Sequence, residues 1–351
     1  MRRPLRAVLA LLAAALVAAG VAGFLLWRQV DAFRSAPFGT ADEKVVEVPT
    51  GASARAVVRA LARAGVLSDA EVAWRYVRFL KRDPRQFKAG EYAFAGPLTP
   101  DEALERIYKG EVRLYRFTVP EGLRVDEIAE IVGASGLVAA EDFLLLAHSA
   151  AEANALGVPA DTLEGYLFPD TYAFARGVTA RQILEAMVRR ALGEYERADA
   201  HRSPEVTVDR AETMTLASII EKETGQPAER TRISCVFHNR LARHIPLATD
   251  PTVMYATYLR TGRWSRNISR ADLRTPHPYN TYLAMGLPPG PIANPGAAAI
   301  RAALQPEGCA DLFFVSRNDG THVFCPDLAC HEAAVKAWQV EYFRRRKGQG
   351  H

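Results

Sequence analysis

The residues of this 351-residue chain that are best suited to acid–base chemistry lie in the segment Leu-Ala-Ser-Ile-Ile-Glu-Lys-Glu-Thr, which begins at Leu216. In a helix, with about 100° per residue, Glu223 shares a face with three apolar residues, Leu216, Ile219 and Ile220, while Glu221 points away. An acid on an apolar face is costly unless it is paired, protonated or beside a cleft. Partial burial raises the pKa of a carboxyl group, which can then donate a proton near neutral pH. The pattern makes Glu223 the candidate catalytic acid.

A structural role for Glu223 is the alternative, because a Glu near a helix C-terminus can pair with Lys222, Arg230 or Arg232. Glu221, on the wetter face, is expected to be a solvated partner of an Arg or Lys. The residues that follow the helix favour the catalytic interpretation.

Four segments after this helix carry hydroxyls, amides and aromatic rings between rigid Pro and Gly residues. They are Thr249-Asp250-Pro251-Thr252, Thr275-Pro276, Tyr279-Asn280-Thr281-Tyr282 and 286–292. Carbohydrate sites combine flat apolar surfaces for sugar rings with a few fixed polar groups for hydroxyls. Singly, most of these residues would only shape turns or fill the core, but their clustering indicates a sugar-binding site.

Helices, loops and a hairpin must position these residues. An aromatic, turn-rich segment from Glu164 to Tyr172 opens the region. The expected elements are helices over Thr179–Arg197, Val208–Thr224 and Glu229–Arg243, loops over Pro246–Pro295, a hairpin of Asp311–Ser316 and His322–Cys325 around Asn318-Asp319-Gly320, and a basic helix over His331–Lys347.

A β-α-α-β pattern precedes this region. Its expected elements are strands at Lys44–Val48 and Tyr92–Phe94, a helix capped by Ser53 that runs to Ala64, and a helix over Asp69–Lys81. An offset of 71 residues relates Val48-Pro49-Thr50-Gly51 to Val119-Pro120-Glu121-Gly122, and Gly65 to Gly136. We interpret this as a weak internal duplication of a strand-helix-helix unit.

The N-terminus has the features of a membrane anchor. Arg2, Arg3 and Arg6 precede Ala7–Trp27, a run of 21 residues without a charge. As a helix, this run is long enough to cross a hydrocarbon core of about 30 Å. The basic residues should stay inside. A cleaved signal peptide is the alternative, although the run exceeds the usual apolar region of such peptides.

Composition and cysteines limit the other function classes. The formal charge of +4 is small and the basic residues are dispersed, which gives no indication of nucleic acid binding. Of the four cysteines, Cys235 is expected to be a packed thiol, and one disulfide is expected among Cys309, Cys325 and Cys330. A zinc site of Cys325, Cys330 and His331 is the alternative, but no second ligand pair accompanies it. We expect no metal and no cofactor.

Several of these segments together resemble a known family. The segments are Glu164-Gly165, Phe168-Pro169-Asp170-Thr171, 217–224, Asp250-Pro251-Thr252-Val253, 269–273, 279–282 and 286–290. In this order, and behind a single anchor, they resemble the MltG (YceG-like) family of endolytic murein transglycosylases over essentially the whole chain. In that family the second Glu of the Glu-Lys-Glu-Thr motif is catalytic, and here it is Glu223.

The patterns and the resemblance together imply an α+β fold with six parts. They are a cytoplasmic tail (1–6), a transmembrane anchor (7–27), a tether (28–43), a LysM-like β-α-α-β module that binds N-acetylglucosamine-containing glycans (44–96), a second strand-helix-helix module (97–160), and a larger mixed α/β YceG-like catalytic domain (161–347).

The resemblance implies cleavage of the β-1,4 bond between N-acetylmuramic acid and N-acetylglucosamine within a glycan strand, which leaves a 1,6-anhydromuramyl end. Glu223 would protonate the leaving oxygen and then take the proton of the C6 hydroxyl. Asp250 is expected to position the substrate. Thr249, Asn280, Tyr282 and Glu164 are further candidate substrate-binding residues.

The biological expectation is an enzyme that terminates the elongation of nascent glycan strands. It would lie in the inner (cytoplasmic) membrane as a single-pass protein, with the N-terminus inside and most of the chain periplasmic. Expected partners are peptidoglycan strands, the lipid bilayer and wall-synthesis proteins such as penicillin-binding proteins, but not nucleic acid. A lysozyme-type muramidase and a non-catalytic glycan-binding scaffold are the alternatives.

Overall fold

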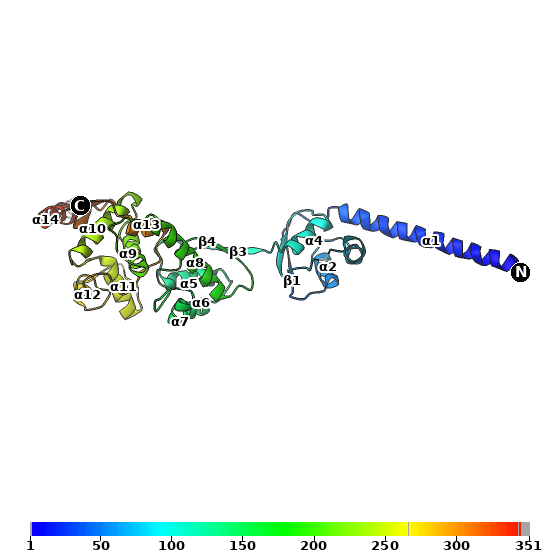
Figure 1. Ribbon diagram of the computed structural model, residues 1–351, viewed down its shortest axis with the longest axis horizontal. Coiled ribbons are helices and arrows are strands. Elements are labelled where there is room, and N and C mark those ends of the chain that lie inside the picture. Colours follow the sequence, from blue (N-terminus) through cyan, green and yellow to red (C-terminus); the bar gives the residue numbers. More distant parts are fainter. Residues whose placement is uncertain (1, 84, 266, 343, 345–351) are drawn as a thin grey trace. The chain divides into compact units, whose positions relative to one another are not determined.

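The computed structural model describes residues 2–83, 85–265, 267–342 and 344, and it divides into two compact units (Figure 1). Unit 1 comprises Met1–Tyr115 and Ala173–Gly177, and unit 2 comprises Arg116–Tyr172 and Val178–His351. Helices and short two-stranded sheets make up both units, which confirms the expected mixed class. Met1 of the predicted tail and residues 345–347 of the predicted catalytic domain lie outside the described residues.

Unit 1 contains the expected β-α-α-β order. Strand β1 (Lys44–Val48) pairs antiparallel with β2 (Gly90–Phe94), and between them lie α2 (Ala54–Arg63), α3 (Ala70–Arg75) and its π-helical continuation η1 (Tyr76–Lys81). The Ser53 and Asp69 side chains cap α2 and α3 by accepting backbone N–H groups of the first turn, as such residues do.

The hydrophobic core of unit 1 also includes α4 (Pro100–Lys109), although the predicted module ended at residue 96. Ala103, Leu104 and Ile107 of α4 are fully buried, and they share one hydrophobic cluster with residues of β1, β2 and α2. Thr99 and Glu102 form a capping box that starts the helix. Residues 97–115 therefore belong to unit 1, because the apolar face of α4 completes its core.

Helix α1 (Arg2–Ser35) contains the apolar N-terminal run. Within the described residues, it is the one helix long and apolar enough to span a membrane, which is consistent with single-pass anchoring. The expected tether over residues 28–43 is wrong at its start, because Val30 and Phe33 are buried in the core of unit 1. The helix thus passes from the apolar run into the folded unit without a flexible joint.

The second strand-helix-helix segment, which the 71-residue offset predicted, has the same order of elements as the first. Strand β3 (Leu114–Thr118) pairs with β4 (Thr171–Ala175), and α5 (Val125–Ala134), α6 (Ala140–Ala147) and α7 (Ala150–Ala155) lie between them in sequence. Gly51 and Gly122 adopt φ angles of 74° and 75°, and Gly65 and Gly136 adopt 76° and 70°. The 71-residue offset therefore relates turns of the same backbone conformation, which only glycine adopts readily.

The rest of unit 2 is a helical assembly around α9 (Arg210–Glu223). It contains α8 (Ala180–Asp199), η2 (Pro227–Glu229), α10 (Arg230–Ala242), α11 (Asp250–Thr261), α12 (Arg270–Arg274) and α13 (Ala297–Leu304). Helix α9 packs against α10, α11 and α13. The prediction of loops throughout 246–295 is wrong for α11 and α12, since Thr249 and Ser269 are N-cap residues and Pro251 lies in a first turn.

A hairpin and a short helix end the described chain. Strand β5 (Phe313–Ser316) pairs antiparallel with β6 (His322–Cys325), which confirms the predicted hairpin. The C-terminal helix starts earlier than predicted, as α14 (Leu328–Val335) continued by η3 (Lys336–Glu341), and residues 343 and 345–347 of the predicted helix lie outside the described residues. Asp327 explains the earlier start, because its side chain accepts the Cys330 N–H.

Two disulfides involve all four cysteines. The Cys325–Cys330 bond confirms the pair expected among the last three, and it removes both thiolates that the zinc alternative required. The Cys235–Cys309 bond contradicts the packed-thiol prediction for Cys235. The apolar, helical surroundings of Cys235 were correct, but the helix brings it beside a loop 74 residues later in the chain.

Candidate functional site

Glu223 is the last residue of α9. The helix starts with a capping box of Asp209 and Glu212, and it ends because Thr224 turns to an extended conformation, with φ −141° and ψ 135°. The predicted apolar face is present, since Leu216, Ile219 and Ile220 are fully buried. Glu223 is therefore placed by a rigid helix at the point where the chain leaves the core.

The Glu223 side chain lines a cavity of about 510 Å³ in unit 2. Five segments form its wall: the end of α9, the helix α10, the loop that leads into α11, the loop that carries Tyr282, and the C-terminal hairpin with the helix after it. The other lining residues are Arg240, Leu247, Ala248, Thr249, Asp250, Tyr282, Phe313, Phe314, Val315, Ser316, His322, His331, Val335 and Gln339. The cavity thus combines one carboxyl with aromatic walls and several hydrogen-bonding groups.

Burial raises the pKa of Glu223 to about 7, and the nearby Asp250 charge acts in the same direction. The Thr249 hydroxyl and the Arg240 guanidinium oppose this rise, because they stabilise the carboxylate. The C-terminal end of α9 also disfavours a negative charge. At neutral pH the group can therefore populate both the acid and the carboxylate form.

Asp250, Thr249 and Tyr282 meet at one side of the cavity. Asp250 is the first residue of α11, and its Oδ1 accepts the Tyr282 hydroxyl at 2.7 Å. Thr249 precedes it, and its hydroxyl makes no side-chain cap to α11. These three predicted residues therefore lie together with Glu223.

Asn280 lies behind this wall and does not line the cavity. It is 1% exposed, and its Nδ2 donates to the carbonyls of Asp272, Leu273 and Thr275 at 3.3, 3.1 and 2.9 Å. Its Oδ1 accepts the Tyr282 N–H at 3.1 Å. The amide therefore holds the loop that presents Tyr282, which does not fit the predicted substrate contact.

Glu164 is also buried away from the cavity. Its carboxyl accepts the Asn294 Nδ2–H at 2.9 Å and the Val125 N–H at 3.2 Å. Burial raises the pKa of Glu164 to about 8. The predicted substrate-binding role does not fit this position, because Glu164 links α5 to the loop before α13 inside unit 2.

Glu221 is less exposed than its predicted wetter face suggested. Its side chain is 6% exposed and pairs with Arg230 at 3.2 Å, while the Gly296 N–H donates to it at 3.1 Å. Pairing with an Arg is confirmed, but the solvated surrounding is wrong, because α9 is packed on several sides. Glu221 and Glu223 therefore differ in their surroundings: Glu221 forms an ion pair with Arg230, whereas Glu223 lines the cavity.

Sequence reasoning missed the far wall of the cavity. Arg240 is held by the Leu312 and Leu247 carbonyls at 2.6 and 2.7 Å, and its guanidinium lies 5.1 Å from the Phe313 ring. His322 Nδ1 lies 2.7 Å from a carboxyl oxygen of Glu229. The hairpin itself was predictable, but its position beside Glu223 depends on long-range packing.

The sequence matches a family over nearly this whole architecture. Residues 46–337 match the YceG-like family. The chain belongs to this family. A relative from Bacillus subtilis (strain 168), named endolytic murein transglycosylase, is 30% identical over 310 residues, which is 84% of each protein.

Two further proteins are similar to this YceG-like protein, one in sequence and one in sequence and structure. An endolytic murein transglycosylase of Streptococcus pneumoniae serotype 2 is 28% identical over 305 residues, which is 77% of this chain but 54% of that protein. A crystal structure of a yceG-like protein from Listeria monocytogenes is 31% identical in sequence, covers 84% of this chain and 99% of its own, and has a TM-score of 0.55.

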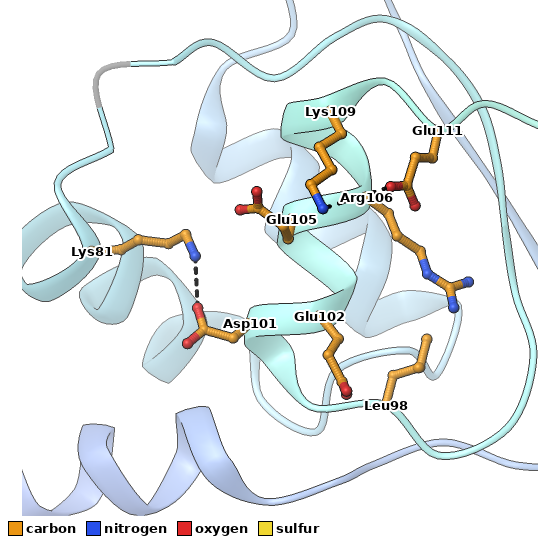
Figure 2. Close-up of a pocket in the computed structure, with 8 residues that line it drawn as sticks. All are labelled: Lys81, Leu98, Asp101, Glu102, Glu105, Arg106, Lys109 and Glu111. Atoms are coloured by element: carbon orange, nitrogen blue, oxygen red, sulfur yellow. Dashed lines mark hydrogen bonds and ion pairs between the residues drawn. The ribbon is translucent and has the colours of Figure 1, made fainter.

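Unit 1 of this YceG-like protein has a different hollow, of about 490 Å³, along α4 (Figure 2). Seven of its eight lining residues are charged, and Lys81 pairs with Asp101 at 2.7 Å. No aromatic ring lines it. Such a surface lacks the flat apolar faces of a sugar site, so glycan binding by a LysM-like module stays a prediction. Within the described part of the chain, no cluster of three His, Cys, Asp or Glu residues could hold a metal ion.

Proposed function

We propose that this protein is an endolytic lytic transglycosylase that cleaves the β-1,4 bond between N-acetylmuramic acid and N-acetylglucosamine within peptidoglycan strands. The observation that carries the proposal is a single glutamate, Glu223, with a pKa raised to about 7, in a cavity walled by aromatic side chains. The printed names of the relatives support the same reaction class.

In the first step, protonated Glu223 donates its proton to the glycosidic oxygen, and the bond from that oxygen to C1 of the muramic acid breaks. The sugar passes through an oxocarbenium-like transition state. The proton leaves with the new hydroxyl of the departing N-acetylglucosamine. A pKa near the operating pH suits this transfer, because a useful fraction of the group is protonated.

In the second step, the Glu223 carboxylate takes the proton of the C6 hydroxyl while the C6 oxygen bonds to C1. The product is a 1,6-anhydromuramyl end, and Glu223 is again an acid. One carboxyl serves both steps, because its charge alternates. Asp250, held by Tyr282, and the Thr249 hydroxyl position the sugar, while Asn280 positions Tyr282.

The same proposal includes the setting of the reaction. Helix α1 anchors the enzyme in the cytoplasmic membrane with its N-terminus inside, and the catalytic unit acts outside on nascent strands, whose elongation it terminates. The apolar length of α1 supports anchoring, and the basic residues before it support the orientation. Penicillin-binding proteins would then be partners, because they extend the same strands.

Glu223→Gln and Glu164→Gln form a matched test, because the pKa is raised in both glutamates but only Glu223 lines the cavity. Purified protein is incubated with peptidoglycan, and the products are analysed by mass spectrometry. Glu223→Gln should lower cleavage by about 100- to 10,000-fold through loss of the acid–base group, and Glu164→Gln should retain it.

The products separate the proposal from its alternatives. Internal cleavage that yields 1,6-anhydro ends agrees with the transglycosylase. Only reducing muramic ends would identify a muramidase, and cleavage that survives Glu223→Gln would favour a non-catalytic role for this residue.

A further inference from the structure

An apolar crevice of about 450 Å³ lies in unit 1, where the anchor helix meets the folded core. Gly23, Leu26, Trp27 and Val30 of α1 form one side, and Arg75, Phe79 and Leu80 of α3 and η1 form the other. Val30 is buried in the core, whereas Leu26 and Trp27 are 48% and 50% exposed. The crevice therefore continues the surface of the membrane-spanning helix into the folded unit.

The position of the crevice along α1 places it at the bilayer boundary. The run without charges ends at Trp27, and Arg28 follows. Trp and Arg side chains at the end of an apolar run mark the interface with the lipid headgroups. Gly23 lies one helical turn, about 6 Å, before Trp27. The Phe79 side chain faces a stretch of α1 that belongs to the acyl-chain region.

Exposed basic residues lie near Phe79 along the chain. Arg75 ends α3, Arg78 and Phe79 lie in the π-helical η1, and Arg82 follows η1 in a left-handed conformation; all four residues are exposed. Phe79 is 58% exposed, which is unusual for a large ring on a folded unit. Nearby acids are otherwise engaged, since Asp83 pairs with Arg85, and Asp101 pairs with Lys81. Among the described residues, no carboxylate lies within ion-pair distance of Arg75, Arg78 or Arg82.

We infer that this crevice binds an anionic phospholipid of the leaflet that faces unit 1. An acyl chain lies between Gly23 and Phe79, and the phosphate contacts the Arg75 and Arg78 guanidinium groups. The bound lipid holds unit 1 against the membrane surface. This site goes beyond glycan cleavage and rests on the anchoring of α1 in a bilayer.

A lipid is favoured over another occupant by two features: the crevice is continuous with the surface of the membrane-spanning helix, and basic side chains lie beside it. A protein partner would have to enter the crevice through the acyl chains that already surround the exposed side chains of α1. A phospholipid is present there, and its phosphate complements the exposed Arg75 and Arg78 guanidinium groups. Basic residues near a membrane surface each favour anionic lipid by roughly fivefold.

Site-directed labelling of the full chain in lipid nanodiscs tests the inference. All four native cysteines are in disulfides, so a single new cysteine can be labelled. Phe79→Cys carries an environment-sensitive fluorophore, and quenching is titrated with phosphatidylglycerol or phosphatidylcholine brominated on the acyl chain. Val45→Cys, at another exposed apolar position of unit 1, is the matched control.

The expected result is quenching at position 79 but not at 45, with phosphatidylglycerol effective at lower mole fractions than phosphatidylcholine. Arg75→Gln with Arg78→Gln should reduce this preference by roughly 30-fold. Arg63→Gln, at an exposed site away from the crevice, should not change it. Circular dichroism confirms that each variant is folded.

Solvent-like emission at position 79 in both lipids, or equal quenching by both lipids in the unsubstituted background, would overturn the inference. A label at Leu16→Cys in the anchor separates this result from failure of the anchor itself. Leu16 lies within the apolar run and must be quenched by either lipid if α1 spans the bilayer. Its protection from both lipids would instead refute the anchoring on which the site depends.

Discussion

At the scale of single residues, the Glu223 carboxyl is balanced between opposing influences. Desolvation and the Asp250 charge favour the acid, while Thr249 and Arg240 favour the carboxylate. Burial also raises the pKa of Glu164, but this residue is 5% exposed, and its carboxyl accepts hydrogen bonds from the Val125 N–H, the Asn294 amide and the Tyr255 hydroxyl. The cavity therefore distinguishes the two residues, since proton transfer requires room for a substrate beside the group.

The pH dependence of the reaction should report the pKa of Glu223. In the proposed mechanism the first step requires the protonated form of Glu223, and its folded-state pKa of about 7 lies above the ordinary value of 4.5. The value of kcat/KM should therefore be high below pH 7 and fall about tenfold per pH unit above it. Measurement of initial rates between pH 5 and about 9 checks this, and a limb near pH 4.5 would contradict the raised pKa.

Thr249→Val should move this limb to higher pH. The hydroxyl lowers the pKa of Glu223, so its removal raises that pKa, and the acid form persists further into the alkaline range. Valine preserves the shape of the buried side chain, and no helix cap is lost, because Thr249 makes none. The pH profile of kcat/KM for the variant is the measurement. An unchanged or acid-shifted limb would show that the hydroxyl does not act on Glu223.

Helical periodicity is local, so the sequence could place Glu223 at the end of the buried face of α9. It misjudged Glu221, because the second side of α9 is covered by residues distant in the chain, such as Arg230 and Gly296. It also took Asn280 and Glu164 as substrate contacts. Polar residues in turn-rich segments bind ligands in some proteins and satisfy buried backbone groups in others, and only packing decides between the two.

At the scale of the elements, local signals predicted the first unit and the hairpin well. Ser53, Asp69 and Thr179 are side-chain caps that fix helix starts within a few residues. Helix α11 was missed because its start at Thr249, with Pro251 in the first turn, was read as a loop signal. Pro restricts the backbone in the same way in a loop and in the first turn of a helix, so this residue does not distinguish the two structures.

The two disulfides should differ in their effect on stability. Cys235–Cys309 closes a loop with a sequence separation of 74, whereas Cys325–Cys330 closes one of 5. Loop-closure entropy then predicts losses of ~4 and ~2 kcal/mol for the two double Cys→Ala variants. Thermal unfolding of unit 2, followed by hydrogen exchange in α9 and α10, gives the comparison. Equal shifts, or a larger effect of the Cys325–Cys330 pair, would contradict the entropic argument.

At the scale of the whole molecule, the chain forms two compact units, and the first of them begins with the apolar helix α1. The strand-helix-helix order appears twice along the chain, and the second copy contacts α11, whose first residue lines the cavity. In that copy, Arg124 stacks on the Tyr258 and Trp264 rings at 4.6 and 4.2 Å, and Glu164 bonds to Val125. The second copy is thus packed against α11 within unit 2, which the offset in the sequence alone could not reveal.

The junction between anchor and unit 1 gives a prediction at this scale. If α1 is part of the fold and not a tether, Phe33→Ala should destabilise unit 1 by about 3 kcal/mol, because Phe33 is 9% exposed in its core. Phe38→Ala is the matched control, since Phe38 is 40% exposed and its bridge to Leu98 uses backbone atoms only.

Hydrogen exchange of β1 and β2 amides in the detergent-solubilised full chain measures the change. Exchange rates that rise by roughly 100-fold for Phe33→Ala, with little change for Phe38→Ala, correspond to this loss. Equal exchange in both variants would mean that the helix ends at the membrane and the following residues are a free linker.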